Sequence, residues 1–319
     1  MDSPVISVVI PVYRSEESLH ELSERLCKTL DGLVSSYEII LVEDSSPDNS
    51  WEIIKKISSL DSRFVGLRLS RNFGQHSAIF AGLKKSRGQW VVVMDCDLQD
   101  QPEEIEKLYQ RAIEGFDQVV AIRKNRQDKL LKILQSRVFA KTLSYLSGDK
   151  INPAVGNFGI YKRDVIDNLN TFKEQGLTFG LMAKWVGFSR DEVEVLHAPR
   201  IYGKTTYSLR ALIQLGFGSI LSHSDRLLKI NVKIGFYLSM FSTLVGIWIL
   251  FRYLFVEESE VGWPSLMVFM TFTTGIILAS IGMVGLYIGR IFEEVKERPK
   301  YIIWEDTTKI SNKGHNFEN

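Results

Sequence analysis

A short acidic stretch in the first third of the sequence has the residue types and spacing that could do chemistry. The run Val91–Met94 carries no charge and no helical period, so it predicts a buried parallel strand, and Asp95-Cys96-Asp97 follows it at once. In an extended backbone Asp95 and Asp97 project to one side and Cys96 to the other. Two neighbouring carboxylates repel each other unless a cation lies between them, and oxygen ligands favour Mg²⁺ or Mn²⁺.

Two interpretations of this stretch stay open at the level of residue spacing. In the first, Gln99 adds a third oxygen and the stretch is a divalent-metal site. In the second, the aspartates belong to a solvated loop before a helix, because Pro102 is suited to the first turn of a helix.

Composition excludes one class of function and indicates a compartment. With 39 Lys+Arg against 38 Asp+Glu in 319 residues, no basic field favours nucleic-acid binding. The two cysteines, Cys27 and Cys96, do not form the pattern of a disulfide framework, which favours a reducing compartment. The first residues lack the basic region of a signal peptide, so we expect the N-terminus to stay in the cytosol.

Strand and helix patterns alternate before the acidic stretch. Apolar strands are expected over Val5–Val12, Tyr37–Val42 and about 64–69, and an amphipathic helix over Glu16–Leu33. This order predicts a doubly wound, mostly parallel α/β sheet that binds ligands at the carboxyl ends of its strands. No G-x-G-x-x-G motif follows the first strand, so a dinucleotide site is not expected.

Polar and basic residues follow several of these strands. Asp44 could accept hydrogen bonds from a base or a ribose, and Tyr13 could stack on a base, although ordinary packing is the alternative for Tyr13. A basic cluster from Arg123 to Arg137 is either a solvated loop or a cover for a diphosphate, since arginine suits phosphate oxygens. A second basic group begins at Arg200 and contains Lys204.

The last third predicts a membrane anchor. Ile234–Phe251 has 18 residues without a charge and Val261–Gly289 has 29, and a helix needs about 20 to cross a bilayer. We therefore expect two spans, at about 232–255 and 264–288, after an interfacial amphipathic helix over 207–230. Lys and Arg flank the pair while the loop between is acidic, which places both termini in the cytosol. The predicted parts are thus residues 1–206, 207–230, 231–290 and a cytosolic tail, 291–319.

Several motifs in one order resemble a known family. Val9-Ile-Pro-Val-Tyr13, Val42-Glu-Asp-Ser-Ser46 and Asp95-Cys-Asp-Leu-Gln99, with two C-terminal spans, resemble the membrane-bound family 2 glycosyltransferases that load a sugar onto a polyisoprenyl phosphate. The motifs at 71–78, 125–128 and 287–291 resemble the bacterial undecaprenyl-phosphate branch. That branch includes bactoprenol glucosyltransferases and undecaprenyl-phosphate 4-deoxy-4-formamido-L-arabinose transferases, and it is related to dolichyl-phosphate mannose synthase.

The resemblance implies a GT-A fold, inversion at the anomeric carbon, and Mg²⁺ or Mn²⁺ as cofactor. It implies a nucleoside-diphosphate sugar as donor, with a UDP-sugar favoured, and polyprenyl phosphate as acceptor. The protein would lie in the lipid bilayer of a bacterial inner membrane, with its active site in the cytoplasm. Assembly into a homo-oligomer is compatible with the resemblance but is not implied by it. Carried over by position, the resemblance implies that Pro11, Tyr13 and Asp44 bind the nucleoside. Asp95, Asp97 and Gln99 would bind the metal and the diphosphate. Arg123 and Arg137 would contact phosphate, and Arg200, with Lys204, would bind the lipid phosphate.

The sequence departs from the family pattern at two places. Relatives often carry Asp at the position of Asn157, and Ser-Lys where this chain has Thr205-Thr206, so Lys204 is the candidate replacement for the missing lysine. We assign no general base to Asn157, because a phosphate monoester with a second pKa of about 6 needs little deprotonation. The alternatives are a family 2 transferase with a glycan acceptor and a non-catalytic membrane scaffold that keeps the fold.

Overall fold

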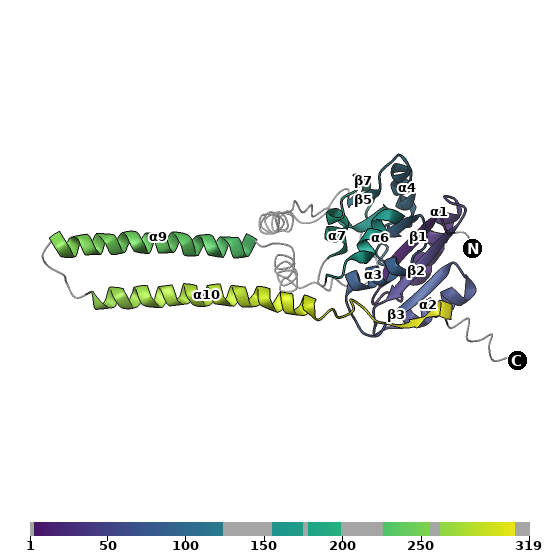
Figure 1. Cartoon of the computed structure of the whole chain (residues 1–319). Coiled ribbons are helices and arrows are strands. Elements are labelled where there is room, and N and C mark those ends of the chain that lie inside the picture. Colours follow the sequence, from purple (N-terminus) through teal and green to yellow (C-terminus); the bar gives the residue numbers. More distant parts are fainter. Residues whose placement is uncertain (1–2, 124–154, 175–177, 199–225, 256–261, 310–319) are drawn as a thin grey trace. The chain divides into compact units, whose positions relative to one another are not determined.

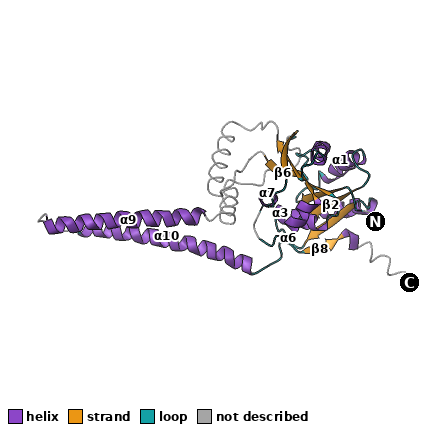
Figure 2. Ribbon diagram, turned by 45° about the horizontal axis from the view of Figure 1, so that its top comes forward, coloured by secondary structure: helices purple, strands orange, loops and turns teal. Residues whose placement is uncertain are grey.

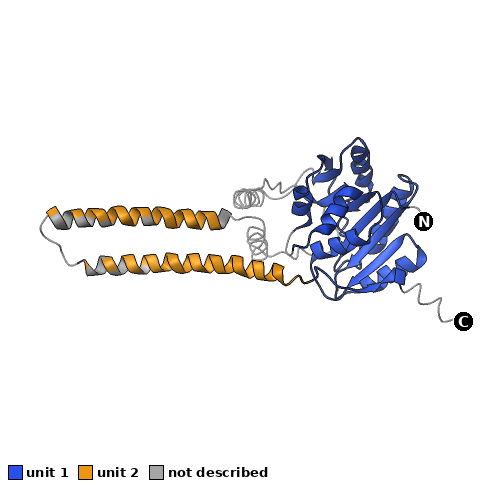
Figure 3. Cartoon of the chain, in the orientation of Figure 1, with its two compact units in different colours: residues 1–140, 152–208, 299–319 blue, residues 141–151, 209–298 orange. Residues whose placement is uncertain are grey.

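The structure, a computed structural model, describes residues 3–123, 155–174, 178–198, 226–255 and 262–309. The chain divides into two compact units (Figure 3). Unit 1 comprises residues 1–140, 152–208 and 299–319, and unit 2 comprises residues 141–151 and 209–298. The acidic stretch therefore lies in unit 1, and the long apolar segments lie in unit 2.

Unit 1 is built around a mixed, mostly parallel sheet (Figures 1 and 2). Its described strands are β1 (Ile6–Val12), β2 (Tyr37–Glu43), β3 (Phe64–Leu69), β4 (Trp90–Val93), β5 (Gln118–Arg123), β6 (Val155–Lys162), β7 (Arg190–Val195) and β8 (Ile303–Asp306). They lie in the order β7-β5-β6-β4-β1-β2-β3-β8. Strands β4, β1, β2 and β3 are parallel, β7 is parallel to β5, and β6 and β8 are antiparallel to their neighbours.

Helices cover both faces of this sheet, which is why its central strands are apolar on both sides. All residues of β1 and β2 are buried. One face packs against α1 (Leu19–Asp31), α2 (Ser50–Leu60) and α4 (Ile105–Ile113), which follows a 3₁₀ turn at Pro102–Glu104. The other packs against α3 (Gln75–Lys85), α6 (Arg163–Thr171) and α7 (Phe179–Trp185). The doubly wound, mostly parallel α/β sheet expected from the sequence is confirmed.

Helix α3 approaches the sheet so closely at Gly82 that a side chain would not fit. A Cβ there would lie 2.3 Å from Val9 Cγ1 and 3.2 Å from Val42 Cγ2, and both valines are buried. Alanine favours a helix over glycine by about 1 kcal/mol, whereas overpacking a core typically costs about 1–3 kcal/mol and the 2.3 Å contact is severe. We expect Gly82→Ala to lower the free energy of unfolding by roughly 1–2 kcal/mol in a denaturant titration. Gly32→Ala is the control, because the nearest atom to its Cβ would be 3.8 Å away; equal effects of the two would contradict the packing.

After helix α10 (Trp263–Val295) of unit 2, the chain returns to unit 1, where β8 forms an edge strand of the sheet. Strand β8 pairs antiparallel with β3, so that Leu67 faces Asp306 and Arg68 faces Glu305. The sequence predicted a cytosolic tail over 291–319, and in the structure residues 299–309 of this stretch pack within unit 1. The pattern gave no sign of this strand because it is four residues long and half acidic.

Unit 2 contains two long helices among its described residues, α9 (Arg226–Phe255) and α10 (Trp263–Val295). They touch where Ser280 Oγ of α10 donates a hydrogen bond to Asn231 Oδ1 of α9 at 3.1 Å. Large apolar side chains along both helices are exposed, most of them by more than half. Within the described part of the chain, one helical segment, Phe272–Val295, is long and apolar enough to cross a membrane. The expectation of two spans stays a prediction, and residues 207–225 of the expected interfacial helix lie outside the described residues.

Candidate active site

The carboxyl ends of β4, β1 and β2 lie side by side along one edge of the sheet. The acidic residues follow directly after these strand ends in the sequence. The amide of Asp44 donates to the carbonyl of Val12 at 3.0 Å, and the amide of Met94 donates to the carbonyl of Val9 at 3.2 Å. Because neighbouring parallel strands end at the same edge, Asp44 and the stretch 95–97 come to one place.

Asp44 is a buried carboxylate that holds the loop between β3 and α3. Its Oδ1 accepts a hydrogen bond from the amide of Phe73 at 2.7 Å, and its Oδ2 accepts one from the amide of Gly74 at 2.8 Å. Burial raises the pKa of Asp44, and the two amides oppose that rise. Gly74 has φ of 92°, a left-handed conformation that favours glycine, so the turn and the carboxylate depend on each other.

The two aspartates after β4 are half-buried and are held by different neighbours. Gln75 Nε2 donates to Asp95 Oδ1 at 2.6 Å, and the main-chain amide of Gln99 donates to Asp97 Oδ1 at 3.1 Å. Cys96 between them is buried in the core beside α1. Burial thus alternates along the loop, with Cys96 in the core and the two carboxylates more exposed.

Two carboxylates on a polar loop suit a hard divalent cation that shares its ligands with a substrate. The described residues contain no group of three or more His, Cys, Asp or Glu side chains that could hold a metal ion. Mg²⁺ commonly takes one or two carboxylates and completes its shell with substrate phosphates and waters. Asp95 and Asp97 fit that pattern, with Gln99 as a further oxygen donor, and these three ligand assignments stay predictions.

The other predicted site residues are described to different extents. Pro11 is buried in β1. Tyr13 is 39% exposed at the same edge, and the Arg14 guanidinium lies 5.4 Å from the centroid of its ring. Arg123 is the last residue of β5, and only its backbone is described. Three predicted residues lie outside the described residues: Arg137, Arg200 and Lys204.

Asn157 lies at the edge of the sheet that carries Asp95. Strand β6 is antiparallel to β4, with Gly159 opposite Val93. The beginning of β6 is therefore at the end of β4, and Asn157 is half-buried there. Asn157 therefore lies at the same edge as the acidic stretch.

Two contacts to the acidic loop were not predicted. Gln75, at the start of α3, binds Asp95 as described above. His197 forms an isolated antiparallel bridge with the buried Asp100, with its Nδ1 3.5 Å from Asp100 Oδ1. The next amide, of Ala198, donates to the carbonyl of Gln99 at 3.0 Å. Both contacts join residues far apart in the sequence, so no local pattern could have indicated them.

His76, next to Gln75, makes the stability of unit 1 sensitive to acid. Its Nδ1 accepts a hydrogen bond from the amide of Phe179 at 3.3 Å, and burial lowers its pKa to about 4. In the unfolded chain His76 has its ordinary pKa of about 6.5, so it is protonated there first. The contribution of neutral His76 to stability is therefore fully present above a pH of about 6.5 and is lost as the pH falls toward 4. We expect a loss of up to roughly 3 kcal/mol, measured as the free energy of unfolding against pH. His76→Asn, which keeps an acceptor near Nδ1, should show a shallower decline; an identical pH profile would contradict this account.

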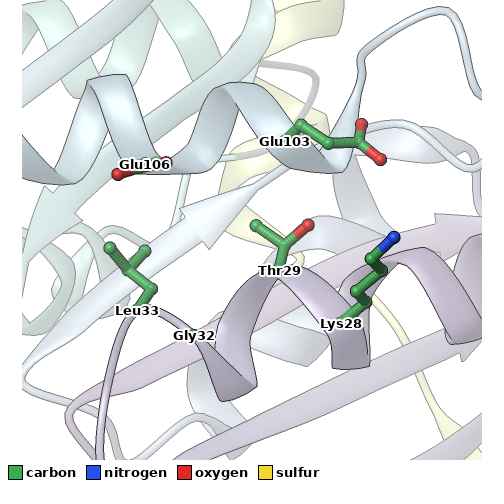
Figure 4. Close-up of a pocket in the computed structure, with 6 residues that line it drawn as sticks. All are labelled: Lys28, Thr29, Gly32, Leu33, Glu103 and Glu106. Carbon is green, nitrogen blue, oxygen red and sulfur yellow. The ribbon is translucent and has the colours of Figure 1, made fainter.

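A surface hollow lies away from these residues. It has a volume of about 320 Å³ and lies between α1 and the turn that begins α4 (Figure 4). Glu103 in its wall pairs with Arg25 at 2.7 Å. None of the predicted site residues lines it, so we do not assign the chemistry to it. Its lining residues are Lys28, Thr29, Gly32, Leu33, Glu103 and Glu106.

Comparison with known proteins defines the class of this chain. The model of the family described as "Glycosyl transferase family 2" matches residues 7–169, which contain Asp44, Asp95 and Asp97. Together with the relatives below, this match shows that the chain belongs to glycosyltransferase family 2. The resemblance stated from the motifs is confirmed at this level.

The relatives match over nearly the whole length. A Bacillus subtilis protein named "Uncharacterized glycosyltransferase YkcC" is 35% identical over 298 residues, which cover 93% of this chain and 92% of that one. The undecaprenyl-phosphate 4-deoxy-4-formamido-L-arabinose transferase of Shewanella sediminis is 34% identical and covers 97% of this chain and 94% of its own. Among solved structures, the Mycobacterium tuberculosis glucosyl-3-phosphoglycerate synthase with Mn²⁺, UDP and glucosyl-3-phosphoglycerate aligns with a TM-score of 0.49 and 17% identity, over 69% of this chain and 78% of that one.

Proposed function

We propose that this chain transfers a sugar from a nucleoside-diphosphate sugar to undecaprenyl phosphate with inversion at the anomeric carbon. The observation that carries the proposal is the pair Asp95 and Asp97 at the sheet edge that also holds Asp44. A family 2 domain joined to long helices with exposed apolar side chains fits a soluble donor and a lipid acceptor. The names of the relatives support the same acceptor.

The donor nucleoside would bind at the ends of β1 and β2. Each oxygen of Asp44 accepts one main-chain hydrogen bond and keeps a second lone pair, so it can accept another from a base or ribose. The exposed ring of Tyr13 would stack on the base beside Pro11. We favour a UDP-sugar such as UDP-glucose, while the choice of sugar depends on hydrogen bonds to its hydroxyls.

Asp95, Asp97 and Gln99 would hold Mg²⁺ or Mn²⁺. When bound, the cation offsets the negative charge of the diphosphate leaving group. Gln75 fixes the direction of the Asp95 carboxylate, and the amide of Gln99 fixes that of Asp97. Held in this way, the two side chains need little rearrangement when the donor arrives.

The acceptor phosphate would be the nucleophile. We assign Arg200 and Lys204 to the lipid phosphate, and Arg123 and Arg137 to the donor phosphates. A lipid-phosphate oxygen forms a bond to C1 of the sugar while the bond from C1 to the diphosphate oxygen breaks, and the nucleoside diphosphate leaves with that electron pair. With a second pKa of about 6, the acceptor is largely a dianion at neutral pH, so Asn157 in place of an aspartate is compatible with the reaction.

The reaction would take place at the cytosolic face of a bacterial inner membrane. Helices α9 and α10 would both span the bilayer, with both chain termini in the cytosol. The support is the exposed apolar surface of the two helices and the basic residues that flank the pair. The segment Phe272–Val295 meets the length and composition of a span.

A lipid-product assay tests the proposal. Membranes containing the protein receive undecaprenyl phosphate, Mn²⁺ and, one at a time, a panel of radiolabelled nucleotide sugars. We expect one sugar to give a label that extracts with lipid and that depends on the added undecaprenyl phosphate. A label found only in glycan or protein would favour a different acceptor, and donor binding without any transfer would favour a scaffold; either result would overturn the proposal.

A further inference from the structure

One arginine, Arg68, connects the edge strand β8 to the end of β2, where the donor is proposed to bind. Arg68 of β3 lies opposite Glu305 of β8, and its Nη1 donates to Glu305 Oε1 at 3.2 Å. Its guanidinium also lies over two rings, at 4.8 Å from the centroid of Trp304 in β8 and 5.9 Å from that of Trp51 in α2. Arg68 is therefore held from the side of β8.

The same arginine forms an ion pair with a buried carboxylate at the end of β2. Arg68 Nε lies 3.2 Å from Oε2 of Glu43, which is 0% exposed. The Nε–H does not point along this contact, so the contact is ionic and not an aligned hydrogen bond. Burial raises the pKa of Glu43, and the amide of Ser46 and the charge of Arg68 oppose that rise. Without Arg68, this carboxylate would be buried with no neighbouring cation in the described structure.

Glu43 in turn fixes the loop that begins with Asp44. Its Oε1 accepts a hydrogen bond from the amide of Ser46. The hydroxyl of Ser46 accepts the amide of Arg14 at 2.8 Å and donates to Asp48 at 2.6 Å. Residue 45 has φ of 52°, a left-handed conformation, so the loop needs such contacts to keep its shape.

We propose that Arg68, which links Glu305 of β8 to Glu43 at the end of β2, is a positioning residue for the loop 44–48, and that β8 supports the donor site through Glu305. The inference rests on the proposed function, in which this loop binds the nucleoside. Within the chain segment that follows α10, Glu305 would then contribute to donor affinity, while Asp306 would serve only to anchor the edge strand.

The chain offers a matched control on the same strand. Lys85 of α3 pairs with Asp306 of β8 at 2.8 Å. This ion pair anchors β8 as the Arg68 pair does, but Lys85 lies on α3, and the ion pairs and hydrogen bonds of the described residues do not join it to Glu43. A variant at Asp306 therefore separates loss of strand anchoring from loss of the link to the loop.

The test compares Arg68→Gln, Glu305→Gln and Asp306→Asn in the full-length protein in lipid nanodiscs. UDP affinity is measured by calorimetry with Mn²⁺ present, and KM for the donor is measured separately from kcat. Because truncating one partner of a buried charged contact has a large effect, we expect UDP affinity to fall about tenfold or more for Arg68→Gln. We expect a few-fold loss for Glu305→Gln and no change for Asp306→Asn, with kcat nearly unchanged in all three.

Hydrogen exchange gives a readout that does not depend on the activity. The amides of residues 44–48 should exchange faster in Arg68→Gln and Glu305→Gln, and at the wild-type rate in Asp306→Asn. Equal behaviour of Glu305→Gln and Asp306→Asn in both measurements would overturn the inference. If the wild type neither bound UDP nor transferred sugar, the proposed function would fail, while the exchange comparison would still decide whether Arg68 positions the loop.

Discussion

Replacing Asp97 with asparagine is expected to reduce sugar transfer by about a thousandfold, because it removes a carboxylate from the site proposed to hold the cation. The amide has nearly the same shape and can still accept the hydrogen bond that the Gln99 amide donates to Asp97. Asp97 is half-buried, so the loss should be one of charge and not of folding. The measurement is initial rate at saturating undecaprenyl phosphate, with Mn²⁺ varied.

The control for this substitution is Glu106→Gln, an exposed carboxylate on the neighbouring helix α4. It changes the net charge equally and should leave the rate as in the wild type. Transfer by Asp97→Asn at the wild-type rate, with the same dependence on Mn²⁺, would refute the metal assignment.

Replacing Asp44 with asparagine is expected to impair both folding and donor binding. The two oxygens of Asp44 accept hydrogen bonds from two main-chain amides, of Phe73 and Gly74. An asparagine has one acceptor oxygen, so its NH₂ group would face an N–H donor in a buried place. Leaving one such amide unsatisfied costs roughly 1–3 kcal/mol. We expect the free energy of unfolding to fall by about 2 kcal/mol and UDP affinity to fall at least about tenfold.

Chemical denaturation and calorimetry with UDP measure the two effects. Asp61→Asn is the control, because Asp61 also accepts a main-chain hydrogen bond, from the amide of Arg63 at 2.9 Å, but is more exposed. Asp61→Asn should lower the free energy of unfolding by about 1 kcal/mol or less, because contacts of exposed charged side chains contribute little to stability. If the two variants lost the same stability and UDP affinity were unchanged, Asp44 would have neither role.

The parallel half of the sheet could be predicted from the sequence because its signal is local. Strands β1 and β2 are apolar runs buried on both faces, and polar residues follow them at once, so both the strands and the edge that carries Asp44 were predictable. The strands β6 and β7 were not expected. Strand β7 has the sequence Arg-Asp-Glu-Val-Glu-Val and is mostly half-exposed or exposed, so its apolar pattern is weak.

The supporting contacts of the site could not be predicted for a different reason. Gln75 meets Asp95 only because α3 begins at the sheet edge where β4 ends, and this depends on the packing of α3 on β1 and β2. Arg68 meets Glu305 across 237 positions of sequence. Contacts of this kind can be identified only once the topology is known. The carboxylates themselves can be identified from the sequence, because each comes directly after an apolar strand.

The central claim is that Asp95 and Asp97 together bind the divalent cation that holds the donor diphosphate. Electron paramagnetic resonance of Mn²⁺ tests this directly, because the signal of free Mn²⁺ decreases when the ion binds a protein. With UDP present, we predict that the wild-type protein binds one Mn²⁺ and that the double variant Asp95→Asn, Asp97→Asn binds none above the level of UDP alone. Equal Mn²⁺ binding by the wild type and the double variant would contradict the account.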